Sequence, residues 1–222
     1  MLFSAPMVRA LIAGEKTQTR RLCKSMNAWV VQDCREVRCV GADWGHFMKG
    51  DTTPIEILRC PHGSPGDLLF VRETTVRVEE HGYKGPVYAA SEQGSAMLDW
   101  GIRPAPDDAC DVEPEDVRRR PAIHMLRAHS RLTLRITEVR IERLQDISEA
   151  DAKAEGVTFG NVTDEATGEI DRDAVEAYEA LWESINGAGS WDANPWVWVV
   201  GFEVIHENVD AYIARTEYAL AA

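Results

Sequence analysis

Residues 11–24, LIAGEKTQTRRLCK, join the end of an apolar helix to a run of cationic and hydroxyl side chains. Four apolar residues before the glycine recur at the spacing of one helical face: Met7, Val8, Leu11 and Ile12. Ser4 can cap the start of this helix, and Gly14 can end it. Residues 16–21 then supply one amine, two hydroxyls and two guanidiniums. Such a cluster at a helix-to-strand junction suits an anionic or hydrogen-bonding ligand.

The bulk composition is that of an ordinary globular chain. Its 222 residues are 45% hydrophobic and 27% charged, which fits one large domain or one domain with an insertion. No apolar run approaches the roughly 20 residues that cross a bilayer. The N-terminal stretch is too short and too interrupted for a signal peptide. We therefore expect a cytoplasmic protein with no membrane partner, and the sequence leaves its oligomeric state open.

The net charge of −13 disfavours a duplex-DNA binder, which normally presents a basic face. The charge is unevenly spread, however. Residues 107–116 carry six acids and residues 151–183 carry ten. Residues 118–143, by contrast, hold eight arginines, and residues 9–24 are also basic. These two basic segments could face one cleft, or their arginines could simply be solvated strand positions.

The five cysteines argue against a disulfide framework, because their number is odd and the chain reads as cytosolic. A zinc site is the sharper alternative, and its candidate ligands are Cys23, Cys34, Cys39, Cys60 and His62. No Cys-x-x-Cys pair is present, and the spacing of Cys60 and His62 is unusual for zinc ligands. We therefore predict that the protein uses no metal and no cofactor.

Turn residues and apolar periodicity predict an α+β fold. Strands are expected at residues 17–23, 68–74, 130–143 and 195–205. Helices are expected at residues 149–155, 171–185 and 208–220. Ser148 and Asp151 have the spacing of a capping box for the first of these, and Gly156 can end it. Residues 24–66 read as irregular, and residues 79–120 read as an insertion with a possible strand at 87–90. Because the helices are short and lie between strands, the pattern favours a small closed mixed sheet over a doubly wound one.

Lys16, Thr19 and Glu155 are the candidate catalytic residues. A lysine three residues before a threonine, across a helix end, can bring an amine near a hydroxyl, which needs such a base to act as a nucleophile. Glu155 lies in the last turn before Gly156 and faces the negative end of the helix dipole, as suits a general acid or base. The alternatives are that Lys16 caps its own helix and that Glu155 is a solvated helix end.

Further candidates lie beside two predicted strands. Arg72 and Glu73 stand at the end of the strand that follows the Pro-Gly-Asp turn at 65–67. Ser130 and Arg131 lie where a loop meets the longest strand, and junctions between loops and strands often carry ligand-binding side chains. A Ser/His pair for acyl transfer is conceivable there, but the sequence lacks a glycine-bounded nucleophile elbow.

Several of these elements together resemble an ASCH domain, a member of the PUA-like superfamily. They are the helix that ends in Ala-Gly-Glu, the run from Lys16 to Arg20, the turn and strand at 65–74, the strand and helix at 139–156, and the strand that begins Pro-Trp-Val-Trp at 195–198. More narrowly, the chain resembles the longer ASCH proteins common in bacteriophages and prophages. The resemblance covers residues 1–77 and 118–206.

The resemblance implies one domain over residues 1–206, with an insertion at about 79–117 and a C-terminal tail at 207–222. It also implies a PUA-like fold, a small mixed β-barrel with short helices packed around it and a cleft between them. A small bacterial ASCH enzyme is an amidohydrolase that removes the acyl group from N4-acetylcytidine. Its catalytic lysine and threonine map onto Lys16 and Thr19, and its glutamate maps onto Glu155. The implied substrate-binding residues are Arg20, Arg21, Arg72, Glu73, Ser130 and Arg131.

We therefore expect an amidohydrolase that acts on N4-acylated cytidine or cytosine nucleosides, with Thr19 as nucleophile assisted by Lys16 and Glu155. Two alternatives use the same cleft. One is a non-catalytic module that binds single-stranded RNA or a modified base, and the other is a ribonuclease. Ligand size separates them, because an amidohydrolase should accept a free nucleoside, whereas a reader or a nuclease should need a polymer.

Overall fold

The computed structural model describes residues 1–23, 36–39, 44–48, 54–78, 86–100, 117–157, 160–164 and 168–221. It is an α+β structure built on a curled antiparallel sheet with a few short helices, and the predicted fold class is confirmed at this level. The chain divides into two compact units. Unit 1 comprises residues 1–13, 68–134 and 204–222, and unit 2 comprises residues 14–67 and 135–203.

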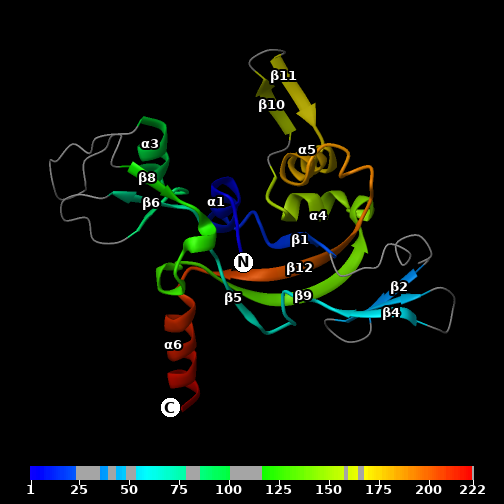
Figure 1. Ribbon diagram of the computed structural model, residues 1–222, viewed down its shortest axis with the longest axis horizontal. Helices are drawn as coiled ribbons and strands as arrows, with labels where there is room; N and C mark the ends of the chain where they lie inside the picture. Colours follow the sequence, from blue (N-terminus) through cyan, green and yellow to red (C-terminus); the bar gives the residue numbers. More distant parts are fainter. Residues whose placement is uncertain are drawn as a thin grey trace. The chain divides into compact units, whose positions relative to one another are not determined.

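Unit 2 contains most of the main sheet, in which β1, β12 and β9 lie side by side in that order (Figure 1). Their bounds are β1 (Gln18–Leu22), β9 (Thr133–Arg143) and β12 (Trp196–Ile205). The register between β1 and β12 sets Thr19 opposite Val200 and Arg20 opposite Val199. All three strands were predicted from the sequence, and each is confirmed within a few residues of its expected bounds.

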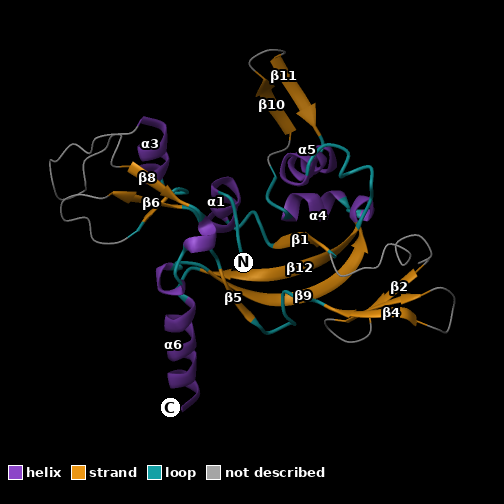
Figure 2. Ribbon diagram, viewed as in Figure 1, coloured by secondary structure: helices purple, strands orange, loops and turns teal. Residues whose placement is uncertain are grey.

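Two helices of unit 2 cover one face of this sheet: α4 (Glu149–Ala154) and α5 (Ala174–Asn186) (Figure 2). Their ends follow the predicted capping chemistry. Ser148 Oγ accepts a hydrogen bond from the Asp151 N–H of α4 at 3.1 Å. Gly156, at a φ of 73°, adopts the left-handed conformation that ends the helix. The predicted helices at 149–155 and 171–185 are thus confirmed.

The core of unit 2 lies between these helices and the sheet. Alternate residues of β12 point to the same face, so Val197 and Val199 are both fully buried there. They pack in one cluster with Leu144 of a short 3₁₀ turn, Leu144–Asp146, and with the rings of Tyr178 and Trp182 from α5. The two rings lie 6.2 Å apart between centroids, in a tilted arrangement that aromatic pairs favour.

The prediction that residues 24–66 are irregular is wrong for part of this range. Three strands form an antiparallel sheet there, in the order β2 (Glu36–Cys39), β3 (Trp44–Met48) and β4 (Pro54–Arg59). A separate hairpin pairs β10 (Gly160–Asp164) with β11 (Gly168–Arg172). These strands have four to six residues each, and their stability comes from cross-strand pairing, which a local reading of the sequence does not detect.

Unit 1 contains a second small antiparallel sheet, with strand order β7-β6-β8. Its strands are β6 (Thr75–Val78), β7 (Val87–Tyr88) and β8 (Val117–Arg120), and the strand expected near residues 87–90 is confirmed. The helix α3 (Glu92–Trp100) was not predicted. The strand expected at 68–74 is shorter than predicted, since β5 spans only Leu68–Phe70. β5 is the last strand in the order of the main sheet, next to β9.

Two further helices of unit 1 match the predictions: α1 (Ala5–Ala13) and α6 (Val209–Ala221). Val8 and Leu11 form the fully buried stripe of α1, and Gly14 ends this helix at a φ of 76°. Two 3₁₀ turns, Ala122–His124 and Arg127–His129, connect β8 to β9. In the described residues, no helix is both long and apolar enough to cross a membrane.

Replacing Leu144 with alanine should lower the free energy of unfolding by about 2–5 kcal/mol, because the substitution leaves a cavity in the core of unit 2. Urea-induced unfolding, followed by tryptophan fluorescence, measures this change. Leu126→Ala is the matched control, because Leu126 is 55% exposed and its loss should change stability by less than about 0.5 kcal/mol. Equal losses in both variants would contradict the described core.

Candidate functional site

Lys16 and Glu155 form a buried ion pair in unit 2. Lys16 lies between the end of α1 and the start of β1, and its side chain is completely buried. Its Nζ donates to Glu155 Oε2 at 2.8 Å and to the Glu155 backbone carbonyl at 2.7 Å. Glu155 is the C-terminal cap of α4, and only 3% of it is exposed. The two residues that the sequence paired as base and acid are therefore in direct contact.

Arg20 holds the second oxygen of the same carboxylate. Its Nη1 donates to Glu155 Oε1 at 3.2 Å, and its Nε donates to Glu142 Oε1 of β9 at 3.1 Å. The guanidinium also lies 3.4 Å from Asp151 Oδ2. Arg140 closes the network, because it donates to Asp151 Oδ1 at 2.7 Å and to Glu142 Oε2 at 3.2 Å. Each carboxylate in this network therefore contacts at least one cation.

Burial lowers the pKa of the Lys16 amine, because removal from water disfavours its charged form. The charge and hydrogen bond of Glu155 oppose this shift, whereas the charges of Arg21 and Arg20 add to it. Burial also raises the pKa of Tyr178, whose ring lies 5.8 Å from the Arg20 guanidinium. A lysine with a lowered pKa is neutral in a larger fraction of molecules near neutral pH than an exposed lysine, and only the neutral amine can accept a proton from a hydroxyl group or water.

Thr19 and Arg21 belong to the other face of β1. Gln18 donates from its side chain to the Asp151 carbonyl at 2.8 Å, so Gln18 and Arg20 both point toward α4. Strand alternation then turns the side chains of Thr19 and Arg21 to the opposite face. Thr19 is only 3% exposed. Arg21 still acts electrostatically on Lys16, and the Glu155 charge acts on Arg21 in turn.

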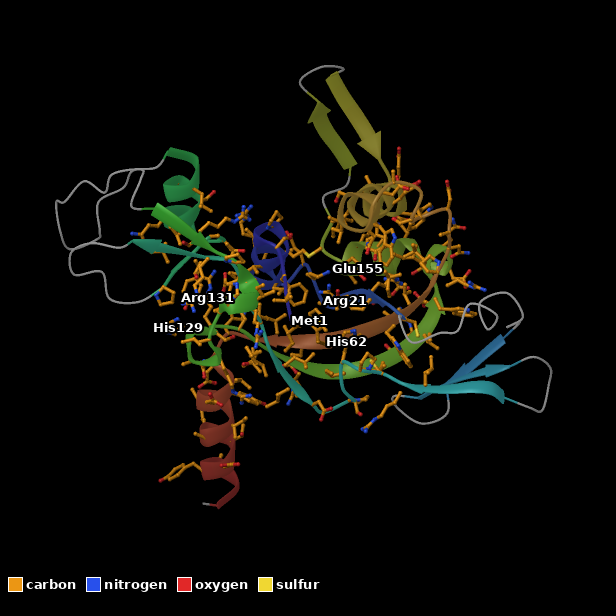
Figure 3. All side chains as sticks on the ribbon, in the orientation of Figure 1. Met1, Arg21, His62, His129, Arg131 and Glu155 are labelled. Carbon is orange, nitrogen blue, oxygen red and sulfur yellow. The ribbon has the colours of Figure 1, made fainter. Side chains whose placement is uncertain are left out.

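His62 is a neighbour of Arg21 that sequence reasoning considered only as a zinc ligand. Burial lowers the pKa of its imidazole, and the Arg21 charge lowers it further. Figure 3 labels Arg21, His62 and Glu155 in one region of unit 2. An imidazole that stays neutral beside a guanidinium can accept or donate a hydrogen bond to a polar ligand.

The remaining predicted site residues form a separate cluster in unit 1. Glu73 is 1% exposed and accepts two hydrogen bonds from Arg131, Nε to Oε1 at 2.8 Å and Nη2 to Oε2 at 2.9 Å. The Ser130 hydroxyl lies within hydrogen-bonding distance of the Val71 and Leu132 carbonyls, which is a structural role. Arg72 donates to the Ile123 carbonyl at 3.3 Å.

The structure thus brings together Lys16, Arg20 and Glu155 in unit 2, and Glu73 and Arg131 in unit 1. Within the described residues, Thr19 makes no hydrogen bond with Lys16 or Glu155. Sequence reasoning missed Glu142, Arg140 and Tyr178. Glu142 and Arg140 alternate with apolar residues on the longest strand, so they looked like an ordinary solvated face. Tyr178 fitted the apolar stripe of its helix and looked like core alone. The one sequence signal for Arg140 and Glu142 was their spacing, because residues two positions apart in a strand point to the same face and can contact one another.

Metal binding finds no support in the part of the chain that the structure describes, where no group of three or more His, Cys, Asp or Glu side chains could hold an ion. Cys34 and Cys110 lie outside the described residues. Compared with known proteins, the chain matches no family model, no curated protein and no solved structure. The resemblance to ASCH domains therefore remains a prediction from motifs, and the functional argument depends on the geometry of the site.

Glu155→Gln should lower the free energy of unfolding by about 3–5 kcal/mol, because it leaves the buried Lys16 amine without its carboxylate. Chemical denaturation measures the change. Glu149→Gln is the matched control on the same helix, where the Glu149 side chain is 62% exposed and pairs with Lys153, so about 1 kcal/mol or less is expected. Adding Lys16→Met to Glu155→Gln should recover part of the loss, and no recovery would argue against a buried charge pair.

Proposed function

We propose that the Lys16–Glu155 pair is the reactive centre of an amidohydrolase that removes the acyl group from N4-acylated cytidine or cytosine nucleosides. The observation that carries this proposal is the contact itself, a completely buried lysine amine 2.8 Å from a buried carboxylate. The ASCH resemblance supplies the substrate class. A PUA-like barrel as the finer description of the fold belongs to the same proposal.

A buried lysine is costly unless it is used or well paired, because desolvation disfavours its charge. At this site the cost is partly offset by Glu155, and the amine remains easier to deprotonate than an exposed lysine. Groups with shifted pKa values of this kind are common among general bases and nucleophiles. Structural ion pairs shift pKa values too, so the activities of Lys16 and Glu155 variants distinguish a catalytic pair from a structural one.

The proposed reaction consumes one water and yields the free cytosine amine and a carboxylic acid. The neutral amine of Lys16 takes the hydroxyl proton of Thr19 as Thr19 Oγ1 bonds to the acyl carbon. The bond between the acyl carbon and N4 then breaks, and the proton on Lys16 passes through Glu155 to N4. Water next adds to the acyl ester and gives a proton to the Lys16–Glu155 pair. The ester bond breaks, and this proton returns to Thr19.

Arg20 and Arg21 have different parts in this scheme. Arg20 is a positioning residue, because its guanidinium is buried and fixes the Glu155 carboxylate from the side opposite Lys16. Arg21 is the residue proposed to hold the polar edge of the substrate, together with the imidazole of His62. The role of Thr19 as nucleophile rests on the resemblance alone, because Thr19 lies on the face of β1 opposite Gln18 and Arg20 and, in the described part of the chain, makes no hydrogen bond with Lys16. A water molecule activated by Lys16 is the alternative that a Thr19 variant distinguishes.

The purified protein should release cytidine from N4-acetylcytidine, and the change in absorbance measures this release. Lys16→Ala and Glu155→Gln should each reduce the rate by at least about 100-fold. Lys153→Ala is the matched lysine control, because Lys153 is an exposed residue of α4, and it should keep the wild-type rate. Thermal melting of each variant shows that it is folded.

Thr19→Val should abolish the reaction, whereas Thr17→Val, at an exposed neighbour, should not. Full activity of a folded Thr19→Val protein would replace the covalent route with direct attack by water. Full activity of both Lys16→Ala and Glu155→Gln would contradict the assigned centre. No release by the folded wild-type protein would contradict the amidohydrolase and favour a binding module.

The rate of cytidine release should rise with pH, because the reaction needs the neutral amine of Lys16. Burial lowers the pKa of this amine, and Arg21 adds to the lowering, so the rising limb lies below the pH at which an exposed lysine titrates. Replacing Arg21 with glutamine removes a nearby positive charge, which should move the limb of kcat to higher pH. A limb that stays in place would show that Lys16 is not the titrating group.

A further inference from the structure

A row of side chains crosses the small sheet of unit 1. Thr75 of β6 pairs with Tyr88 of β7 on one side and with Arg120 of β8 on the other. Directly opposed residues of antiparallel strands present their side chains on the same face. The Arg131 guanidinium extends the row, because it lies 4.2 Å from the centroid of the Tyr88 ring. Two half-buried arginines therefore lie at the ends of the row, and between them are the half-buried Tyr88 ring and Thr75, which is only 5% exposed.

Arg131 is held in place before any ligand arrives. Glu73 binds its Nε and one Nη2 hydrogen, Tyr88 covers one face of the guanidinium, and the side chain stays 30% exposed. The Tyr88 hydroxyl is itself fixed, because it donates to the His129 carbonyl at 2.9 Å, and Figure 3 labels His129 beside Arg131. The Nη1 hydrogens face no partner among the described residues. A guanidinium ordered in this way loses little entropy when it binds an anion.

Arg120 has a positive charge that nothing in the described part of the chain neutralises. It is half-buried, yet its side chain makes no hydrogen bond or ion pair with any described residue. Partial burial of an unpaired guanidinium is unfavourable. An anionic group bound on the Thr75 face would remove this cost, and arginine binds phosphate oxygens in a planar, two-pronged geometry.

Other residues of unit 1 also combine cationic side chains with aromatic and apolar ones. Arg72 and Arg127 lie 5.0 and 5.6 Å from the centroid of the Phe70 ring, and Arg127 is already paired with Asp210 at 2.7 Å. The 3₁₀ segment that follows Arg120 exposes two large apolar side chains, Ile123 at 56% and Leu126 at 55%. Cationic groups that alternate with aromatic and apolar surface are typical of proteins that bind single nucleic-acid strands, where phosphates meet arginines and bases stack or pack.

We propose that Arg120 and Arg131, the half-buried ends of this row, bind the phosphodiester backbone of a single nucleic-acid strand, with Thr75 and Tyr88 packed between them. These residues all belong to unit 1, and the proposal does not depend on the proposed hydrolase. In the row itself, Arg120 and Arg131 outnumber the single buried carboxylate of Glu73, so the row is net positive.

The test is fluorescence anisotropy of the full chain with a short labelled oligocytidylate, in its RNA and DNA forms, at several salt concentrations. The RNA form should bind, and Arg120→Gln should weaken binding about tenfold and reduce the salt slope by about 0.7. Arg119→Gln is the matched control. Arg119 pairs in register with Val76, so it lies on the opposite face of the same strand and is exposed. It should bind like the wild type.

Three outcomes would overturn the proposal. The first is the absence of binding to either oligonucleotide. The second is an equal loss in Arg119→Gln and Arg120→Gln, which would indicate diffuse electrostatic attraction. The third is equal competition by polyglutamate, which would point to an acidic protein partner. Equal affinity for the RNA and DNA forms would keep the site and show that it reads phosphates without the 2′-hydroxyl. Because no readout involves hydrolysis, the result is independent of the amidohydrolase assay.

Discussion

The hydrogen bonds from the Lys16 amine to Glu155 are the interaction on which unit 2 depends. α4 has only six residues, and a helix of this length is not stable by itself in water. Several contacts tie it to β1 and the residues just before it. Lys16 donates to the carboxylate and the carbonyl of Glu155, the Thr17 N–H donates to the Ala154 carbonyl, and Gln18 donates to the Asp151 carbonyl. The same atoms that fix the helix end also set the environment of the amine. Structure and proposed chemistry therefore share one set of contacts.

Charge balance explains why this buried network is tolerated. Three cations, Lys16, Arg20 and Arg140, meet three carboxylates, and each carboxylate contacts at least one of the cations. Burying ions is unfavourable unless partners and hydrogen bonds compensate, and here both are present. The network also restricts the Glu155 carboxylate to one orientation. A preoriented carboxylate needs little rearrangement when a proton moves, which is what a proton relay requires.

The sequence predicted what local chemistry determines. Capping by Ser148, the glycines at 14 and 156 and the apolar stripes of α1 and α5 each act within a few residues, so their elements were found near their observed bounds. The short strands of β2, β3 and β4 depend on one another and were missed. The contact between Lys16 and Glu155 was predicted only through the resemblance, because no local pattern pairs a strand start with a distant helix end. Arg20 was predicted to bind substrate, whereas it contacts three carboxylates of the protein.

The separation along the chain of the two paired residues has a consequence for biosynthesis. Lys16 and Glu155 are 139 positions apart, so Lys16 emerges from the ribosome long before Glu155 is synthesised. Until then the amine stays hydrated and has the basicity of any surface lysine. Closing so long a loop is entropically slow, and contacts of this range form late in folding. The amine therefore acquires its special environment only after most of the chain has been synthesised, and an interrupted translation product that ends before α4 lacks the centre altogether.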